Sequence, residues 1–450
     1  MAQGRKRTHQ IPPVWFLSLL PAALALPRLT SECPAGFKGR LDSPGYTQCA
    51  VPTDDASGPH PSQWAPWTHK PLCVEGAAPK TQPSGGSDDG PSGTTAPPPR
   101  TKFCVYTNAH AGDGGMSIIT TPEHAASSLH LLEDPSLHLP SSSSSSSSRL
   151  HNASTTPAYK VVDVPGKGKG VLATRRIRRF EPFMLERAAL ATDNLFASLV
   201  ERHAGYRLLR EAVGRLADPD RVLSLARSNP HAGDAVENVL RTNSFAGELD
   251  GAPHMVLFPL IARMNHACKP NAFTRFSRRS MVAVAVAAQD IEAGEEINIS
   301  YAALGMEFQQ RQTQLQNTWG FKCTCAACTA PESSRAVSDQ RRRDIKAKRQ
   351  ELVDSIDNAD APVAVRLSLE ILDLLASEHL PSLFAEQYEI LARIFHMIRY
   401  KDKAVKYAEM ALKVLDIYGA LDEDDEHKGI EALMASFDEP SLPAMGERPK

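Results

Sequence analysis

Three cysteines lie within six residues in the last third of the chain, in the run Cys323-Thr324-Cys325-Ala326-Ala327-Cys328. Ordinary core cysteines occur singly, whereas zinc prefers thiolates gathered in a tetrahedral shell. The run supplies three such ligands, so the fourth must come from elsewhere, and Cys268 is the only other cysteine outside an N-terminal group. We therefore predict a zinc site with the ligands Cys268, Cys323, Cys325 and Cys328.

The predicted zinc would be structural, because a shell of four cysteines leaves no position for the water that catalytic zinc activates. A redox-active pair formed by Cys325 and Cys328 is the alternative, but the surrounding sequence lacks the strand–helix–strand context typical of such pairs. The N-terminal group is separated from these cysteines by a long stretch without cysteine, so its chemistry can differ. Its members are Cys33, Cys49, Cys73 and Cys104.

The length and charge of the chain limit the class of protein. At 450 residues the chain is too long for one ordinary core, which favours two domains with unstructured segments. Its 50 Lys and Arg residues nearly balance its 52 Asp and Glu residues, so the basic excess typical of a nucleic-acid-binding domain is absent. We expect a monomer with no direct nucleic-acid partner and no transmembrane segment.

The N-terminal third of the chain differs in character from the rest. Residues 1–26 place Arg5-Lys6-Arg7 before an apolar run, as in a secretory signal peptide; an apolar tail or a misassigned start is the alternative. Residues 27–157 are rich in Pro, Gly and Ser, so we predict that they are poorly packed, with at most a small disulfide-linked piece. Export would pair the four N-terminal cysteines in two disulfides of unknown connectivity.

We expect the folded part of the chain to begin near Tyr159. Residues 194–242 are predicted to be a helical insert, because apolar residues recur there at three- and four-residue spacings. Many short strands with a helical insert predict an α+β domain of small sheets over residues 158–302. Gly-containing turns separate the predicted strands, which are residues 160–164, 171–174, 255–258, 272–276, 281–287 and 297–301.

Residues 339–436 are predicted to be helical. Part of this region, residues 388–415, resembles a tetratricopeptide-like (TPR-like) helix pair, with small alanines where two helices would pack closely. A generic helical bundle is the alternative. The basic run from Arg341 to Arg349 is either the solvated face of the first helix or a nuclear-localisation or phosphate-binding cluster.

Several motifs follow one another in order before the cysteine run. They are Gly168-Lys169-Gly170-Val171-Leu172-Ala173, Asn243-Ser244-Phe245, Asn265-His266-Ala267-Cys268-Lys269-Pro270-Asn271 and Gly294-Glu295-Glu296-Ile297-Asn298-Ile299-Ser300-Tyr301. In this order they resemble the motifs of the SET-domain family of protein lysine methyltransferases, whose hallmark reads N-H-x-C-x-P-N. The domain order is most similar to the SET-and-MYND (SMYD) branch and its fungal relatives. No cysteine lies between residues 194 and 240, so we expect no MYND zinc finger.

The resemblance implies S-adenosylmethionine as the methyl donor and the ε-amine of a protein lysine as the acceptor. It also implies a knot-like threading of the hallmark against the tyrosine strand, with the post-SET zinc region, residues 303–330, closing over the cofactor. Tyr301 would be the catalytic residue, and Phe321 would stack on the adenine. The residues implied to surround the cofactor are Lys167, Gly168, Lys169, Asn243, Asn265, His266, Tyr301 and Phe321.

The sequence leaves several points open. Trp319 stands where SMYD-type sequences usually have a tyrosine, so the number of methyl groups transferred is undecided. Histones and other nuclear or cytosolic proteins are all compatible substrates. Zinc thiolates and S-adenosylmethionine suit the nucleus or cytoplasm, whereas the N-terminal segment favours the secretory pathway. The alternative functions are a catalytically silent SET scaffold that binds protein partners and a secreted, disulfide-rich protein.

Overall fold

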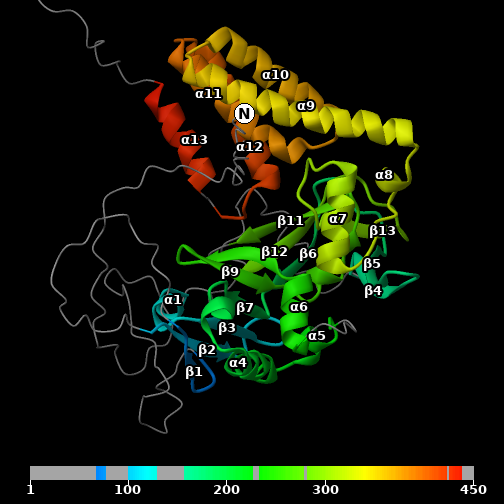
Figure 1. Cartoon of the computed structure of the whole chain (residues 1–450), viewed down its shortest axis with the longest axis vertical. Helices are drawn as coiled ribbons and strands as arrows, with labels where there is room; N and C mark the ends of the chain where they lie inside the picture. The colour runs from blue at the N-terminus through cyan, green and yellow to red at the C-terminus, as the bar shows by residue number, and fades with distance from the viewer. Residues whose placement is uncertain are drawn as a thin grey trace, which may run out of the picture.

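Three small β-sheets form the centre of the structure, and helices pack around them (Figure 1). The structure is a computed structural model, which describes residues 67–77, 100–128, 157–226, 233–277, 281–422 and 425–437. The signal-like segment 1–26, together with Cys33 and Cys49, lies outside the described residues. None of the described helices is long and apolar enough to cross a membrane.

The strands are short, as the sequence predicts. They are β1 (Leu72–Glu75), β2 (Lys102–Asn108), β3 (Met116–Thr120), β4 (Tyr159–Val164), β5 (Gly168–Ala173), β6 (Pro182–Arg187), β7 (Leu190–Asp193), β8 (Phe245–Leu249), β9 (Ala252–Leu257), β10 (Asn265–His266), β11 (Ala272–Ser277), β12 (Val282–Ala287) and β13 (Glu296–Ile299). They form a six-stranded sheet in the order β1-β2-β3-β7-β9-β8, a four-stranded sheet in the order β10-β13-β5-β4 and a three-stranded sheet in the order β11-β12-β6. The predicted α+β class with small sheets is confirmed.

The helices fall into three groups along the chain. Next to the six-stranded sheet lie α1 (Pro122–Ser127) and the predicted insert, which consists of α3 (Phe196–Leu199), α4 (Arg202–Gly214), α5 (Asp220–Leu223) and α6 (Ala235–Asn243). The short 3-10 helix η5 (Ile261–Arg263), α7 (Phe308–Trp319) and α8 (Ala326–Thr329) flank the cysteine motifs. The C-terminal group contains α9 (Glu332–Asp357), α10 (Ala361–Ser377), η6 (Pro381–Leu383), α11 (Phe384–Met397), α12 (Lys401–Tyr418) and α13 (Asp425–Ser436).

The prediction that residues 27–157 are poorly packed is wrong for the parts that the structure describes. β2 pairs with β1 and β3, and β3 pairs in parallel with β7. Phe103, Tyr106 and Ile118 on these strands are fully buried. The prediction missed these short strands because Pro-, Gly- and Ser-rich stretches lie on either side of them. The fold therefore includes residues well before Tyr159.

Cys73 and Cys104 connect the first two strands. They stand directly opposite each other on β1 and β2 and form a disulfide. Of the predicted N-terminal disulfides, this is the pairing that the described residues contain. Cys268, Cys323 and the other cysteines of the C-terminal group are free thiols.

The alternation of valine and alanine in β12 explains how this strand is buried on both faces. Its three valines pack against Leu421, which follows α12, whereas its three alanines belong to the main core together with Phe258. Successive side chains of a strand point to opposite faces, so the two residue types serve two different neighbours. β12 therefore joins the β-sheet core to the C-terminal end of the helical region.

The C-terminal region is helical as predicted, although its first helix begins at Glu332 rather than near residue 339. α11 and α12 are joined by a short turn and pack side by side. Ala404, Ala408 and Ala411 are completely buried on α12, which confirms the predicted close packing at small residues. The TPR-like assignment stays a prediction.

The three N-terminal strands generate a test of the domain boundary. A chain that starts at Tyr159 would lose β1, β2 and β3 and expose β7 at a new sheet edge. We expect this chain to lose the cooperative unfolding transition that a chain starting at Trp67 shows. A marginally stable domain that loses three of the six strands of one sheet is expected not to stay folded. Near-ultraviolet circular dichroism during heating measures the difference. The same cooperative transition in both chains would contradict the placement of β1 to β3 in the core.

Candidate active site

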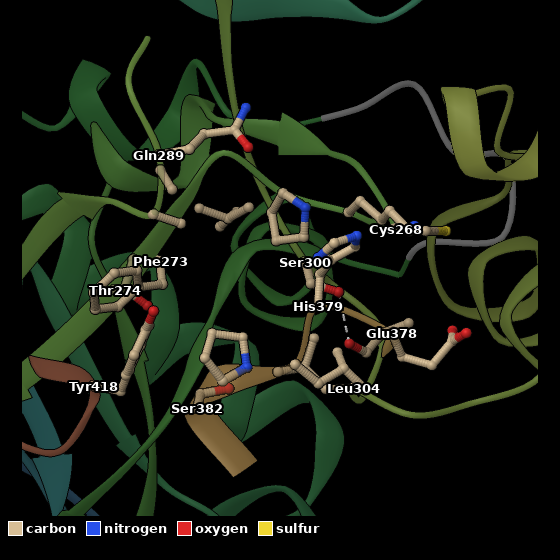
Figure 2. Close-up of a pocket in the computed structure, with 18 of the residues that line it drawn as sticks. Cys268, Phe273, Thr274, Gln289, Ser300, Leu304, Glu378, His379, Ser382 and Tyr418 are labelled. Atoms are coloured by element: carbon tan, nitrogen blue, oxygen red, sulfur yellow. Dashed lines mark hydrogen bonds between the residues drawn. The ribbon is translucent and has the colours of Figure 1, made fainter. Parts of the chain in front are cut away.

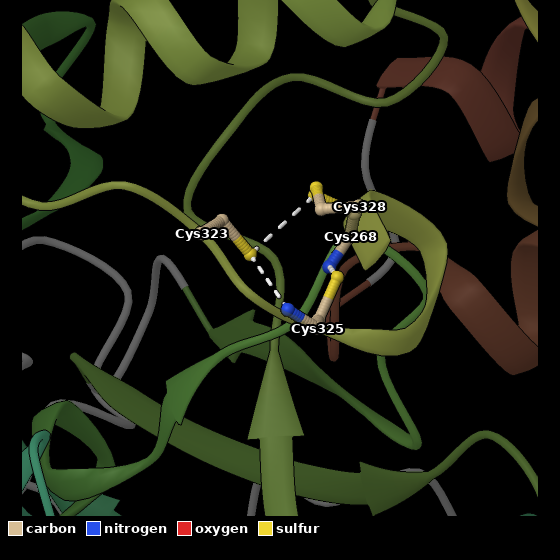
Figure 3. A group of neighbouring side chains, drawn as sticks. All are labelled: Cys268, Cys323, Cys325 and Cys328. Carbon is tan, nitrogen blue, oxygen red and sulfur yellow. Dashed lines mark hydrogen bonds between the residues drawn. The ribbon is translucent and has the colours of Figure 1, made fainter. Parts of the chain in front are cut away.

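The four cysteines of the predicted metal site come together at one point (Figure 3). Their sulfur atoms all lie within 4.8 Å of one another. Cys268 follows β10, whereas Cys323 and Cys328, which lie 55 and 60 residues further along the chain, belong to the segment around α8. Sulfur atoms at this separation form a shell that could hold one zinc ion.

Backbone N–H groups and one glutamine hold the cysteine segment in place. The N–H of Cys268 donates to Sγ of Cys325, and the N–H of Cys325 donates to Sγ of Cys323, each at a distance of 3.5 Å. The side-chain oxygen of Gln312 on α7 accepts from the N–H of Cys323 at 3.0 Å, and its nitrogen donates to the Cys323 carbonyl at 2.9 Å. Sequence reasoning missed Gln312, because nothing in the surrounding helix distinguishes it from its neighbours.

His266 lies between the cysteine cluster and Tyr301. β10 pairs in parallel with β13, and the register places His266 opposite Ile299. The N–H of Tyr301 donates to Nδ1 of His266 at 2.9 Å, and Nε2 of the same ring lies 3.3 Å from Sγ of Cys268. Burial lowers the pKa of His266 to about 4, so the ring is neutral near pH 7 and Nδ1 can accept this hydrogen bond.

The hydroxyl of Tyr301 donates to the carbonyl oxygen of Met264 at 2.7 Å. Met264 directly follows η5, whose start is fixed by the buried carboxylate of Glu186 on β6. This carboxylate accepts from the N–H groups of Leu260 and Ile261, each at 2.8 Å. Because the hydroxyl hydrogen is engaged, the Tyr301 oxygen acts toward any further group only as an acceptor.

Aromatic rings surround the side chain of Tyr301. The ring centroids of His266 and Trp319 lie 5.4 Å and 5.3 Å from that of Tyr301, and Phe321 lies 6.2 Å from His266. Nε1 of Trp319 donates to the carbonyl of Thr242 at 2.8 Å. This bond attaches the end of α7 to the end of α6 and directs the indole N–H toward the α6 backbone.

The glycine loop between β4 and β5 is connected to the hallmark through Glu296. Gly168 has a φ of 75°, in the left-handed region that favours glycine. Nζ of Lys167 pairs with one oxygen of Glu296 at 2.6 Å, and the other oxygen accepts from Nδ2 of Asn265 at 2.9 Å. Asn265 also donates to the carbonyl of Lys169 at 3.2 Å. Sequence reasoning placed Glu296 in a motif but assigned it no contact.

Two of the predicted cofactor residues direct their side chains elsewhere. Nζ of Lys169 pairs with Asp163 at 2.8 Å, so only its backbone carbonyl meets Asn265. Nδ2 of Asn243 donates back to the carbonyl of Val239 in its own helix at 3.0 Å. The side chains of Lys169 and Asn243 are therefore both engaged by neighbours that are not predicted cofactor residues.

The basic run on α9 is used in ion pairs. Arg341 and Arg342 both pair with Glu378, at 3.3 Å and 2.9 Å, and Arg343 pairs with Glu307 at 2.7 Å. Arg342 and Glu378 are buried. These ion pairs attach α9 to the turn before η6 and to the start of α7. This part of the run is therefore not a freely solvated face, and its charges are not available to bind phosphate.

Comparison with known proteins agrees with the motif order. Residues 168–302 match the SET domain family. The chain is 32% identical to the histone-lysine N-methyltransferase Set5 of Schizosaccharomyces pombe over 198 residues, which are 43% of this chain and 58% of that protein. It is 31% identical to human N-lysine methyltransferase SMYD2 over 102 residues, 22% and 23% of the two chains. It is 38% identical to human histone-lysine N-methyltransferase SMYD3 over 72 residues, 16% of each chain.

Residues 168–302 therefore match a SET domain, and the glycine motif from Gly168 to Ala173, the hallmark and Tyr301 all lie within these bounds. The similarity to Set5, SMYD2 and SMYD3 confirms the predicted resemblance to SET-domain lysine methyltransferases, the SMYD branch included. The chain spans a little over half the length of Set5 and smaller shares of the SMYD proteins.

The contacts of Gln312 give a test of the metal centre. Replacing Gln312 with Ala should weaken zinc binding roughly 10- to 100-fold, which is the usual cost of removing a group that orients a metal ligand. Competition with a chromophoric chelator measures the affinity. Gln316→Ala is the matched control, because Gln316 is an exposed residue of the same helix. Equal zinc affinities in the two variants would show that Gln312 does not support the site.

Proposed function

We propose that this chain is an S-adenosylmethionine-dependent methyltransferase that transfers a methyl group to the ε-amine of a lysine in a protein substrate. The observation that carries the proposal is the position of Tyr301, which is held by Met264 and His266 and whose chain neighbours Ser300 and Ala302 line an open cleft. Set5 and SMYD3 are named as histone-lysine enzymes, so a histone is one candidate substrate, and other nuclear or cytosolic proteins suit the same chemistry. The nucleus or cytoplasm is the corresponding location.

The cysteine cluster suits a structural zinc ion. Four sulfur atoms within 4.8 Å cannot all ionise unless a cation balances their charge, because like charges this close repel strongly. Zinc supplies that charge, and four thiolates complete its tetrahedral shell. Cys268, Cys323, Cys325 and Cys328 would therefore fix the post-SET segment against the hallmark and leave the chemistry to other residues.

The residues next to the cysteine cluster suit S-adenosylmethionine. When bound, this cofactor supplies an electrophilic methyl group on a cationic sulfur. The carbonyl of Lys169 and the aromatic faces of Tyr301 and Phe321 suit a cation, and Phe321 also offers a stacking surface for adenine. The residues proposed to hold the cofactor are Lys167, Gly168, Lys169, Asn243, Asn265, His266, Tyr301 and Phe321.

Tyr301 would orient the substrate amine. Its oxygen accepts, since its own hydrogen is bonded to Met264, so it can receive an N–H of the amine and direct the lone pair toward the methyl group. The same oxygen stabilises the positive charge that develops on the nitrogen. The amine must be neutral to react, and apolar walls such as Phe245 and Trp319 lower a lysine pKa by disfavouring the ammonium form.

A cleft whose lining includes Ser300 offers a path for the substrate (Figure 2). It has a volume of about 1110 Å³ and lies between β11, the segment after β13 and the turn between α10 and α11. Phe245, Ser300 and Ala302 belong to its lining, and the last two are the chain neighbours of Tyr301. A protein segment in this cleft can therefore present a lysine side chain to Tyr301.

A catalytically silent scaffold is not favoured. Asn265, His266 and Tyr301 are all present. Asn265 donates to the carbonyl of Lys169, and the N–H of Tyr301 donates to His266. The strand that holds Asn265 and His266, β10, also pairs with β13, which ends just before Tyr301. A chain that used the SET domain only as a platform would not need the Tyr301 hydroxyl to be held by a backbone carbonyl. An activity measurement decides between the two functions.

Replacing Tyr301 with Phe should lower kcat on the order of 100-fold, because removal of one preorganised group aimed at developing charge has a cost of this size. S-adenosylmethionine binding should change little, since the ring stays in place. Transfer of a tritiated methyl group to a protein extract measures activity, and calorimetry measures cofactor binding. Tyr400→Phe is the matched control, because Tyr400 is 58% exposed on the C-terminal helices. No methyl transfer by the unaltered protein would refute the proposed enzyme function.

A further inference from the structure

The cleft lined by Ser300 and Ala302 contains charged groups of both signs, and they differ in how well they are already paired. Asp290 pairs with Arg176 at 2.5 Å and accepts from the N–H of Arg179 at 2.8 Å. Hydrogen bonding to Arg176 holds the pKa of Asp290 below its usual value. The carboxylate is therefore ionised and already paired with Arg176, which also pairs with Glu292 at 3.3 Å, so its attraction for an incoming cation is reduced.

Glu378, the other acidic residue of the cleft, is neutralised more completely. It is buried, it pairs with Arg341 and Arg342, and it accepts from the hydroxyl of Ser338 at 2.6 Å. Two guanidinium groups serve this one carboxylate. Its contribution to the potential of the cleft is accordingly cancelled by its own partners.

The cations of the cleft have no such partners. Arg179 and Lys269 are exposed members of the lining, and among the described residues no carboxylate forms an ion pair with either of them. The guanidinium carbon of Arg179 lies 4.4 Å from the centre of the Phe180 ring, which holds the charge at the cleft without neutralising it. The charge available to a ligand in the cleft is therefore positive.

One wall of the cleft is aromatic and fixed in place. Phe273 on β11 lies 4.7 Å from Tyr418 at the end of α12, and Phe180 lies 6.1 Å from the same ring. Arg275 of β11 donates to the carbonyl groups of residues 419 and 420 directly after α12, which secures Tyr418 against the sheet. Across the cleft, Leu304 is 39% exposed and offers an apolar contact.

We propose that the cleft selects protein segments in which acidic residues flank the target lysine and an apolar side chain lies nearby. This inference rests on the proposed lysine methyltransferase function and specifies its substrate class. The acidic side chains pair with Arg179 and Lys269, the apolar side chain packs against Phe273 and Tyr418, and the lysine reaches Tyr301. A protein segment is favoured over a single-stranded nucleic acid, because the proposed function requires a protein lysine and the chain neighbours of Tyr301 line the cleft.

Three synthetic peptides test the proposal. Each has about 15 residues, a central lysine and one leucine, and they differ only in carrying four Glu, four Gln or four Arg residues around the lysine. Fluorescence anisotropy measures binding to the full chain, and tritiated methyl transfer is measured in parallel. The Glu peptide should bind most tightly, and added salt should weaken its binding, as expected for exposed charge pairs.

Substitutions connect the preference to named residues. Arg179→Gln and Lys269→Gln should each weaken binding of the Glu peptide roughly two- to fivefold, the range for exposed ion pairs, and leave the Gln peptide unchanged. Arg207→Gln is the matched control, since Arg207 is exposed on α4 and is not part of the cleft lining. The zinc content of Lys269→Gln is measured as well, because Lys269 adjoins Cys268.

Several results would overturn the proposal. They are equal or tighter binding of the Gln or Arg peptide, loss of binding in Arg207→Gln but not in the cleft variants, no measurable binding of any peptide, or displacement of the Glu peptide by a tighter-binding single-stranded RNA. Methyl transfer to all three peptides at equal rates would refute the substrate preference alone. Preferential binding of the Glu peptide without any methyl transfer would refute the proposed function and leave the acidic preference of the cleft supported.

Discussion

The convergence of four cysteine sulfur atoms is the interaction on which the rest of the site depends. It joins Cys268, shortly after β10, to a segment that begins 55 residues later. β10 in turn lies beside β13, and His266 bonds to both Cys268 and the backbone of Tyr301. A metal at this point would therefore fix the tyrosine, the hallmark and the Phe321 segment together.

The motifs could be predicted from sequence because their chemistry is local. Closely spaced cysteines indicate a metal, and a glycine with φ of 75° lies where the glycine motif indicates a tight turn. The contacts between motifs could not be predicted, since the parallel pairing of β10 with β13 and the link from Lys167 to Asn265 through Glu296 depend on the folded chain. Gln312 could not be identified from the sequence, because its role depends on its hydrogen bonds to the backbone of Cys323 in the folded chain.

The strands before residue 128 were missed for a different physical reason. Composition averages over a long window, and the Pro-, Gly- and Ser-rich stretches outweighed three strands of four to seven residues. Their place in the sheet depends on the pairing of β3 with β7, which lies far along the chain. The basic run on α9 is a similar case. Its charges predicted a solvated face or a phosphate-binding cluster, yet Arg342 is buried against Glu378. The positive charge without an ion-pair partner lies instead at Arg179 and Lys269 in the cleft.

We propose that a zinc ion at the cysteine cluster holds the cofactor pocket in its binding-competent form. Calorimetric titration of S-adenosylmethionine into the protein, before and after removal of zinc by a chelator, tests this claim directly. We expect zinc-free protein to retain its β-sheet circular dichroism but to lose detectable cofactor binding, and one equivalent of zinc to restore it. Unchanged cofactor affinity in protein shown to be free of zinc would contradict the account.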